Sequence, residues 1–154
     1  LENIPSGKII NAELKAETIR TSHFKEIEKQ LRARRDEIIV SSFEHSLLPD
    51  YKKSGYKTGC LLEREHFQKG FLRLFISLLI LRPYSINIPL EFFYLIKGIN
   101  LKLIMFLFRS VSKNIIVWTV NNPEDFKLVS NYADMIITDD VETGMKFKNR
   151  YNNY

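Results

Sequence analysis

The chain has 154 residues, which suits one ordinary domain, and 45% of them are hydrophobic, enough to bury a core. Its 12% aromatic content argues against a disordered chain. The net charge of +5 favours anionic partners such as nucleic acid, anionic lipid or phosphorylated small molecules. Nothing in the sequence matches a nucleic-acid-binding module, and the one basic cluster, residues 32–35, ends an expected helix, where cations complement the dipole. We therefore expect no nucleic-acid partner.

The single cysteine and the first residue are the sequence features that concern the cellular location of the protein. Cys60 is the only cysteine, so no internal disulfide forms, and its apolar neighbours favour a small buried residue over a nucleophile. No signal peptide is visible at Leu1, where the chain begins without Met. We expect a fragment or processed product in a cytoplasmic or membrane-associated location.

Strands and helices alternate along the first half of the chain. Runs rich in apolar and β-branched residues predict three strands, at residues 8–14, 37–43 and 56–62. Between them we expect an amphipathic helix over residues 21–35 and a short helix within residues 44–55. Residues 66–81 form the most apolar helix candidate. We expect it to pack in the core, the alternative being a helix that touches a membrane or a partner; its apolar run is short of the roughly 20 residues that span a bilayer.

The second half continues the alternation. We expect a strand at residues 84–88, a helix at 101–111, buried strands at 115–120 and 135–138, and a closing helix at 140–151. Asn122 is expected to cap a helix that has Pro123 in its first turn. Repeated alternation of this kind predicts a mainly parallel α/β sheet, in which functional side chains gather at the carboxyl ends of the strands.

One such strand end carries a carboxylate and an ammonium. Glu13 and Lys15 are two residues apart, so their side chains share one face of the strand. A carboxylate oxygen suits Ca²⁺ or Mg²⁺, and an ammonium can neutralise a phosphate oxygen. A simple ion pair between the two is the alternative.

Several short motifs resemble the glycerophosphodiester phosphodiesterase family, in the order in which that family has them. They are Glu13-Leu14-Lys15, Ser42-Phe43, the segment 59–62, Trp118-Thr119-Val120-Asn121 and Ile136-Ile137-Thr138-Asp139. The resemblance covers nearly the whole chain. It implies the C-terminal part of a (β/α)8 barrel, or TIM barrel, that is incomplete in this chain.

The resemblance also implies roles for individual residues. Glu13 would be a metal ligand, with Ca²⁺ or Mg²⁺ as the cofactor, and Lys15 would be the catalytic residue at the phosphate site. Phe43 and Trp118 would wall the pocket on the glycerol or leaving-group side, the alternative for both being ordinary core packing. Asn121 and Asp139, just past strand ends, are expected to serve as turn and capping residues.

The chain departs from the family in its histidines. The family's His-Arg-Gly, Glu-x-Asp and His-Asp segments do not occur. We expect His23 and His66 to be solvated near helix starts, whereas His45, near a strand end, has a conceivable acid–base role. Residues 1–154 are therefore expected to be a single partial domain that lacks the N-terminal part of its barrel.

The implied function is metal-dependent hydrolysis of a glycerophosphodiester to glycerol 3-phosphate and an alcohol. We expect this chain to be inactive alone, with a missing N-terminal half or a second chain completing the barrel. The alternative is a non-catalytic phosphodiesterase-like domain that binds lipid head groups or a protein partner. The apolar helix and the positive charge favour that alternative slightly, and they leave contact with a membrane surface open.

Overall fold

A parallel sheet of six strands organises the chain. The computed structural model describes residues 3–16, 19–96 and 99–151. Each strand pairs in parallel with the one that precedes it, so the order in the sheet is the order in the sequence. The strands are β1 (Ile10–Glu13), β2 (Ile38–Ser42), β3 (Lys57–Leu61), β4 (Ser85–Pro89), β5 (Asn114–Trp118) and β6 (Met135–Ile136).

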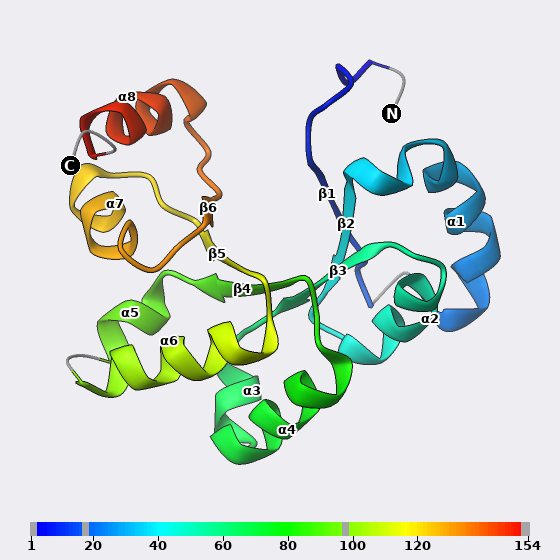
Figure 1. Cartoon of the computed structure of the whole chain (residues 1–154), viewed down its shortest axis with the longest axis horizontal. Coiled ribbons are helices and arrows are strands. Elements are labelled where there is room, and N and C mark those ends of the chain that lie inside the picture. Colours follow the sequence, from blue (N-terminus) through cyan, green and yellow to red (C-terminus); the bar gives the residue numbers. More distant parts are fainter. Residues whose placement is uncertain (1–2, 17–18, 97–98, 152–154) are drawn as a thin grey trace.

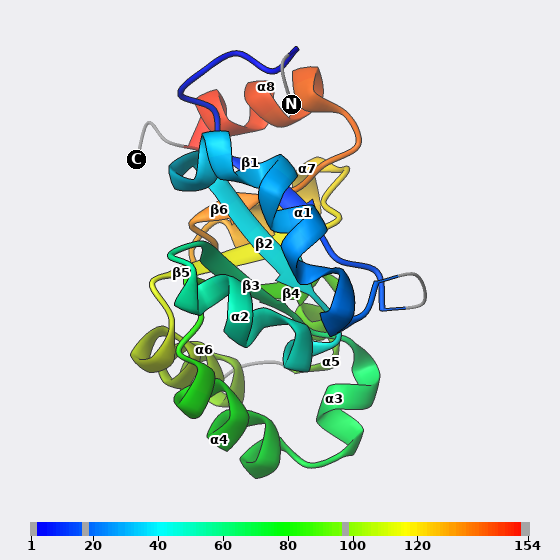
Figure 2. The same ribbon diagram turned by 90° about the vertical axis from the view of Figure 1, so that its right-hand side faces the viewer.

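Helices connect the strands and lie around the outside of the curved sheet (Figures 1 and 2). The α-helices are α1 (Phe24–Leu31), α2 (Leu48–Lys53), α3 (Arg64–Gln68), α4 (Phe71–Leu81), α5 (Glu91–Leu95), α6 (Ile99–Val111), α7 (Pro123–Val129) and α8 (Val141–Tyr151). Short 3₁₀ helices occupy η1 (Thr21–His23), η2 (Arg32–Glu37) and η3 (His45–Leu47). The described strands and helices form a half-barrel of the α/β class.

The two faces of the sheet differ in chemistry. One face packs against the helices, and its strand residues are almost completely buried; they are Ile38, Val40, Cys60, Leu62, Ile86, Ile88, Ile115 and Val117. The opposite, inner face is mixed: it carries apolar residues such as Ile39 and Ile116 beside small and polar ones. Across it, Glu13 pairs with Ser41, Ser41 with Gly59, and Gly59 with Ser85. Since residues in a strand alternate between faces, the apolar core and the mixed inner face are built from the same strands.

Gly59 allows neighbouring strands to pack closely on the inner face. A Cβ atom at this position would lie 2.8 Å from Ser85 Oγ and 3.2 Å from Ser41 Cβ. Both distances are tighter than ordinary van der Waals contact, so a larger residue would push the side chains of β2 and β4 apart.

The expected alternation of strands and helices is confirmed, with two corrections. The helix predicted over residues 21–35 is the α-helix α1 flanked by the 3₁₀ helices η1 and η2, and Arg34 leaves the helical conformation. The helix predicted over residues 66–81 is two helices, α3 and α4, separated at Gly70. Gly70 has a φ of 103°, a backbone conformation that ends α3 and that side-chain-bearing residues rarely adopt. The short helix α5 was not expected. Within the part of the chain that the structure describes, no helix combines the length and the apolar character needed to cross a membrane.

The expected cap of α7 is confirmed. The Asn122 side chain accepts a hydrogen bond from the Asp125 amide at 2.9 Å, and its own amide group donates to the Asp125 carboxylate at 2.6 Å. The hydroxyl of Tyr94 in α5 also donates to Asp125, which is buried. This cap therefore joins α5 to α7 as well as starting the helix.

Candidate functional site

Glu13 and Lys15 lie together at the carboxyl end of β1. Their neighbours Ala12 and Leu14 pack towards the hydrophobic core, which leaves Glu13 and Lys15 on the inner face. Lys15 Nζ donates to Glu13 Oε1 at 2.5 Å. The Lys15 side chain is 61% exposed and the Glu13 side chain is 30% exposed. The prediction that both side chains share a face is confirmed. The pair is accessible to a ligand, because water still reaches both groups.

Phe43 and Trp118 meet on the same side of the sheet. Phe43 follows β2 and Trp118 ends β5, and their ring centroids are 5.8 Å apart in an edge-to-face arrangement. Both rings are half-buried, so each keeps an edge that a ligand can contact. The structure therefore places the four predicted residues as two pairs, one charged and one aromatic, at the ends of β1, β2 and β5.

The inner face also has buried polar atoms without a hydrogen-bond partner in the described part of the chain. These atoms are Ser41 Oγ, Asn87 Nδ2 and Trp118 Nε1. Asn87 is held by Ser85, whose hydroxyl donates to Asn87 Oδ1 at 2.8 Å. An unpaired buried donor costs about 1–3 kcal/mol, so a ligand that accepts these hydrogen bonds would be stabilised.

Ser41 and Asn87 were not among the site residues predicted from the sequence. For Asn87 the signal is the alternation Ser85-Ile86-Asn87-Ile88, in which a strand buried on both faces presents polar side chains to one face. Ser41 has no comparable signal, because it follows three apolar residues and precedes a second serine.

Two histidines hold the loops next to this end of the sheet. His45 Nε2 contacts the Leu61 carbonyl at 3.0 Å, and His66 Nε2 contacts the Phe43 carbonyl at 3.2 Å. The two rings are stacked, with centroids 4.8 Å apart. The expectation that His66 is solvated is wrong, because its ring is packed between these loops. His23 is exposed, as expected.

Burial is the main cause that lowers the pKa of His45, and the neighbouring His66 ring lowers the pKa further. The Leu61 carbonyl opposes this by favouring the protonated ring. The lowered pKa favours the neutral form of His45, and its Nε2 atom is already engaged with the end of β3. This geometry favours a structural role over the acid–base role that its position in the sequence suggested.

The described residues do not form a complete site for a divalent cation. Glu13 offers one carboxylate, and no group of three or more His, Cys, Asp or Glu side chains among the described residues is placed to hold a metal ion. Ca²⁺ needs six or more oxygen ligands, and Mg²⁺ needs an octahedron. A cation bound at Glu13 would therefore require further ligands from outside these residues.

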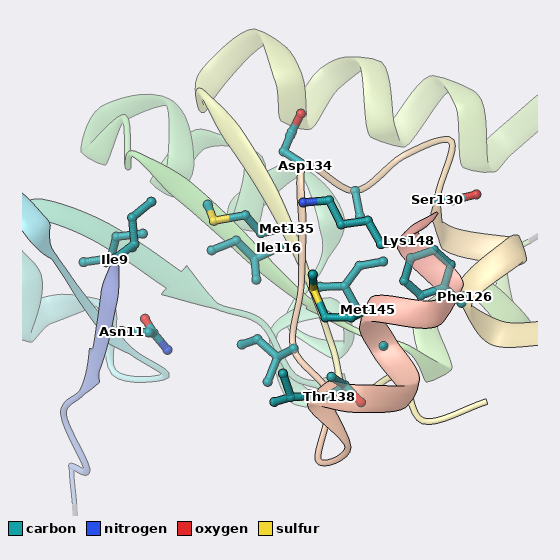
Figure 3. A pocket seen from close by; sticks show the side chains of 16 residues that line it. Ile9, Asn11, Ile116, Phe126, Ser130, Asp134, Met135, Thr138, Met145 and Lys148 are labelled. Carbon is teal, nitrogen blue, oxygen red and sulfur yellow. The ribbon is translucent and has the colours of Figure 1, made fainter. Parts of the chain in front are cut away.

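A hollow on the inner face lies apart from the predicted residues. It is a cavity of about 610 Å³ between β1 and α8, and Figure 3 shows Ile9 and Asn11 opposite Thr138, Met145 and Lys148. Its lining is mostly apolar and includes none of the four predicted site residues. The cavity is the open side of the half-barrel, where the two edges of the sheet face each other.

The structure also places three further residues for which the sequence predicted a role, Cys60, Asn121 and Asp139. Cys60 is buried, and burial raises the pKa of its thiol, in agreement with a packing residue. Asn121 Nδ2 donates to Asp139 Oδ2 at 2.8 Å, and Asn121 Oδ1 accepts from the Asp139 amide at 3.0 Å. These bonds link the segments after β5 and β6, which fits the turn role expected for both residues. The helix caps are made by their neighbours, since Asn122 accepts from the Asp125 amide and Asp140 accepts from the Thr143 amide.

Comparisons with known proteins identify solved structures that resemble this one. No protein-family model matches the sequence, and no curated protein matches it. The structure is similar to the crystal structure of a glycerophosphodiester phosphodiesterase from Thermotoga maritima, with a TM-score of 0.75 and 29% identity, covering 94% of this chain and 60% of that one.

Two more distant neighbours share the fold. A putative glycerophosphoryl diester phosphodiesterase from Silicibacter pomeroyi has a TM-score of 0.73 and 16% identity, covering 90% of this chain and 50% of that one. A phosphodiesterase from Oleispira antarctica was solved in complex with the product sn-glycerol-3-phosphate. It has a TM-score of 0.65 and 15% identity, covering 92% of this chain and 55% of that one. The chain thus spans 50–60% of the length of these three solved structures.

Proposed function

We propose that this chain is part of a glycerophosphodiester phosphodiesterase, which hydrolyses a glycerophosphodiester to glycerol 3-phosphate and an alcohol. The observation that carries the proposal is the likeness to the Thermotoga maritima enzyme over 94% of the chain at 29% identity. The charged pair Glu13–Lys15 at the end of β1 supports it, because active sites of such folds lie at the carboxyl ends of the strands.

In this proposal Lys15, Phe43 and Trp118 contact the substrate, and Glu13 would be one ligand of a divalent cation, Ca²⁺ or Mg²⁺, whose other ligands come from outside the described residues. The Lys15 ammonium contacts a phosphate oxygen and stabilises negative charge that develops there, while Glu13 keeps the ammonium oriented. The half-buried edges of Phe43 and Trp118 contact the glycerol and leaving-group carbons. Asn87 Nδ2 and Trp118 Nε1 are buried donors that suit hydroxyl or phosphate oxygens.

Proton transfer and metal binding are proposed to need groups outside these 154 residues. His45 and His66 are engaged with strand-end carbonyls, and Glu13 is a single carboxylate. We propose that either a longer polypeptide or a second chain pairs with the edges of the half-barrel and supplies the remaining groups. The chain alone is then inactive.

The test is hydrolysis of glycerophosphocholine with Ca²⁺ or Mg²⁺. We expect no turnover from the folded chain alone, and turnover from a chain extended upstream of Leu1. In the extended chain, Glu13→Gln should abolish turnover, whereas Glu26→Gln, an equal change at an exposed position of α1, should leave it unchanged. Turnover that survives Glu13→Gln would contradict the proposed site.

The second candidate function is non-catalytic binding of a lipid head group, which the unpaired donors of the inner face favour. It predicts that the chain alone binds glycerol 3-phosphate in calorimetry, and that Lys15→Ala weakens binding while Lys8→Ala does not. Binding without turnover in both the short and the extended chain would select this function over the enzyme.

A further inference from the structure

Two neighbouring helices, α4 and α6, expose an apolar surface. Six of the thirteen large hydrophobic side chains that are exposed among the described residues lie in α4 and α6. They are Leu72, Ile76, Leu79, Ile80, Leu103 and Phe106, which we call the apolar patch. In α4, Ile76, Leu79 and Ile80 follow Leu72 by four, seven and eight positions, which is the spacing of residues on one face of a helix.

The opposite faces of α4 and α6 hold them against the protein. Leu74 and Leu78 of α4 are buried, as are Met105 and Phe108 of α6. The two helices touch each other through Phe71 and Phe108, whose ring centroids are 6.1 Å apart. Figures 1 and 2 show both helices side by side at one end of the molecule. The apolar patch is therefore the solvent-facing side of two helices that pack against each other and against the rest of the protein.

The positive charge of the whole chain is concentrated in the same segment. Residues 66–123 carry seven of the 23 Lys and Arg but only one of the 18 Asp and Glu, Glu91. The remaining residues carry 16 basic and 17 acidic side chains, so they are close to neutral. In the described structure Arg73 and Lys102 are exposed beside the apolar residues of α4 and α6. Apolar side chains flanked by cations are typical of surfaces that enter the headgroup region of an anionic bilayer.

A groove next to α4 adds two further lysines to this surface. It has a volume of about 760 Å³ and is lined by Lys52 and Lys53 of α2 and by Ser77 and Ile80 of α4, with Glu44 also in its wall. Lys52 Nζ donates to the carbonyls of Leu81 and Arg82, at the end of α4. The groove therefore brings the side chains of two lysines to the border of the apolar patch.

We propose that the patch on α4 and α6 docks this protein on the surface of an anionic phospholipid bilayer. The four apolar side chains of α4, with Leu103 and Phe106, enter the acyl boundary, and Arg73, Lys102 and Lys53 contact lipid phosphates. A second copy of the chain fits this face less well, because two such faces would bring like charges together without an acidic partner. This inference does not depend on the proposed hydrolysis.

The test is co-sedimentation of the 154-residue chain with vesicles of phosphatidylcholine containing roughly one third phosphatidylglycerol. We expect binding to these vesicles and little binding to pure phosphatidylcholine. Arg73→Gln with Lys102→Gln should reduce the affinity about 30-fold, since each cation near such a surface contributes about fivefold. Ile80→Ser with Phe106→Ser should reduce it at least about tenfold, because both apolar side chains leave the bilayer.

Matched controls lie on other helices. Lys25→Gln with Lys29→Gln removes the same charge from α1, and Val141→Ser with Met145→Ser removes exposed apolar groups from α8; both should change the affinity less than about twofold. Circular dichroism verifies that every variant is folded. Wild-type chain that stays in the supernatant would overturn the proposal. So would equal losses in the control variants, or a dimer that Ile80→Ser with Phe106→Ser converts to a monomer, because then a second copy covers the patch.

Discussion

Replacing Gly59 with alanine probes the close packing on the inner face of the sheet. The new Cβ would lie 2.8 Å from Ser85 Oγ, 3.2 Å from Ser41 Cβ and 3.3 Å from Ile39 Cγ2. Ser85 cannot turn away freely, because its hydroxyl holds Asn87 Oδ1 in a buried position. Overpacking of this kind costs about 1–3 kcal/mol, and the loss of glycine's freedom in the unfolded chain returns about 0.4–1 kcal/mol. We expect a net loss of about 1–2 kcal/mol.

The assay is thermal and urea unfolding followed by circular dichroism. For a chain of this length the loss corresponds to a decrease in Tm of about 2–8 °C. In a Ser85→Ala background the same substitution should cost about 1 kcal/mol less, because the closest clashing atom is gone; Ser85→Ala alone is the reference for this double-mutant cycle. If Gly59→Ala is as stable as the wild type, or if the cycle shows no coupling, the strands β2, β3 and β4 are not as tightly packed as the structure describes.

Three further predictions concern other parts of the fold. Asn122→Ala should destabilise the chain by about 0.5–2 kcal/mol in urea unfolding, because α7 loses its cap and Asp125 loses a partner; an unchanged midpoint would contradict that role. The Cys60 thiol should react with a thiol reagent only in denaturant, since burial raises its pKa and covers it; fast labelling of the native chain would refute this. Stability should fall as the pH drops below about 6.5, where His45 is protonated in the unfolded chain but stays neutral in the native one. His45→Gln keeps a donor for the Leu61 carbonyl and should weaken this pH dependence; an unaltered profile would show that other groups cause it.

The alternation of strands and helices was predictable because the strands are apolar runs that can be recognised in the sequence without tertiary information. Apolar runs such as Ile38–Val40 and Ile115–Val117 are buried almost completely, so their composition matches their environment. The break at Gly70 was not predictable from periodicity, because the apolar spacing continues through it while the backbone turns at a positive φ. The helix α5 was missed because five residues between Pro89 and the next helix give no periodic signal.

The candidate site was predictable only in part. Glu13 and Lys15 share a face because strand geometry has a period of two, which needs no tertiary information. The contact between Phe43 and Trp118 joins residues 75 positions apart, and only the curvature of the sheet brings them together. The packing of His66 against the loop after β2 depends on the same tertiary arrangement, so its position at a helix start was misleading.

The order of the strands has a consequence for how the chain is made on the ribosome. Every pair in the sheet joins segments that are 18–29 residues apart, for example Ile39 with Lys57 and Ser85 with Asn114. Each strand can therefore dock on the one synthesised just before it, without waiting for a distant partner. During synthesis the growing sheet always presents one newly formed edge to the surroundings, and the next strand to emerge is the one that covers it. Translation that stalls after β3 would hold this edge open and would favour pairing between nascent chains.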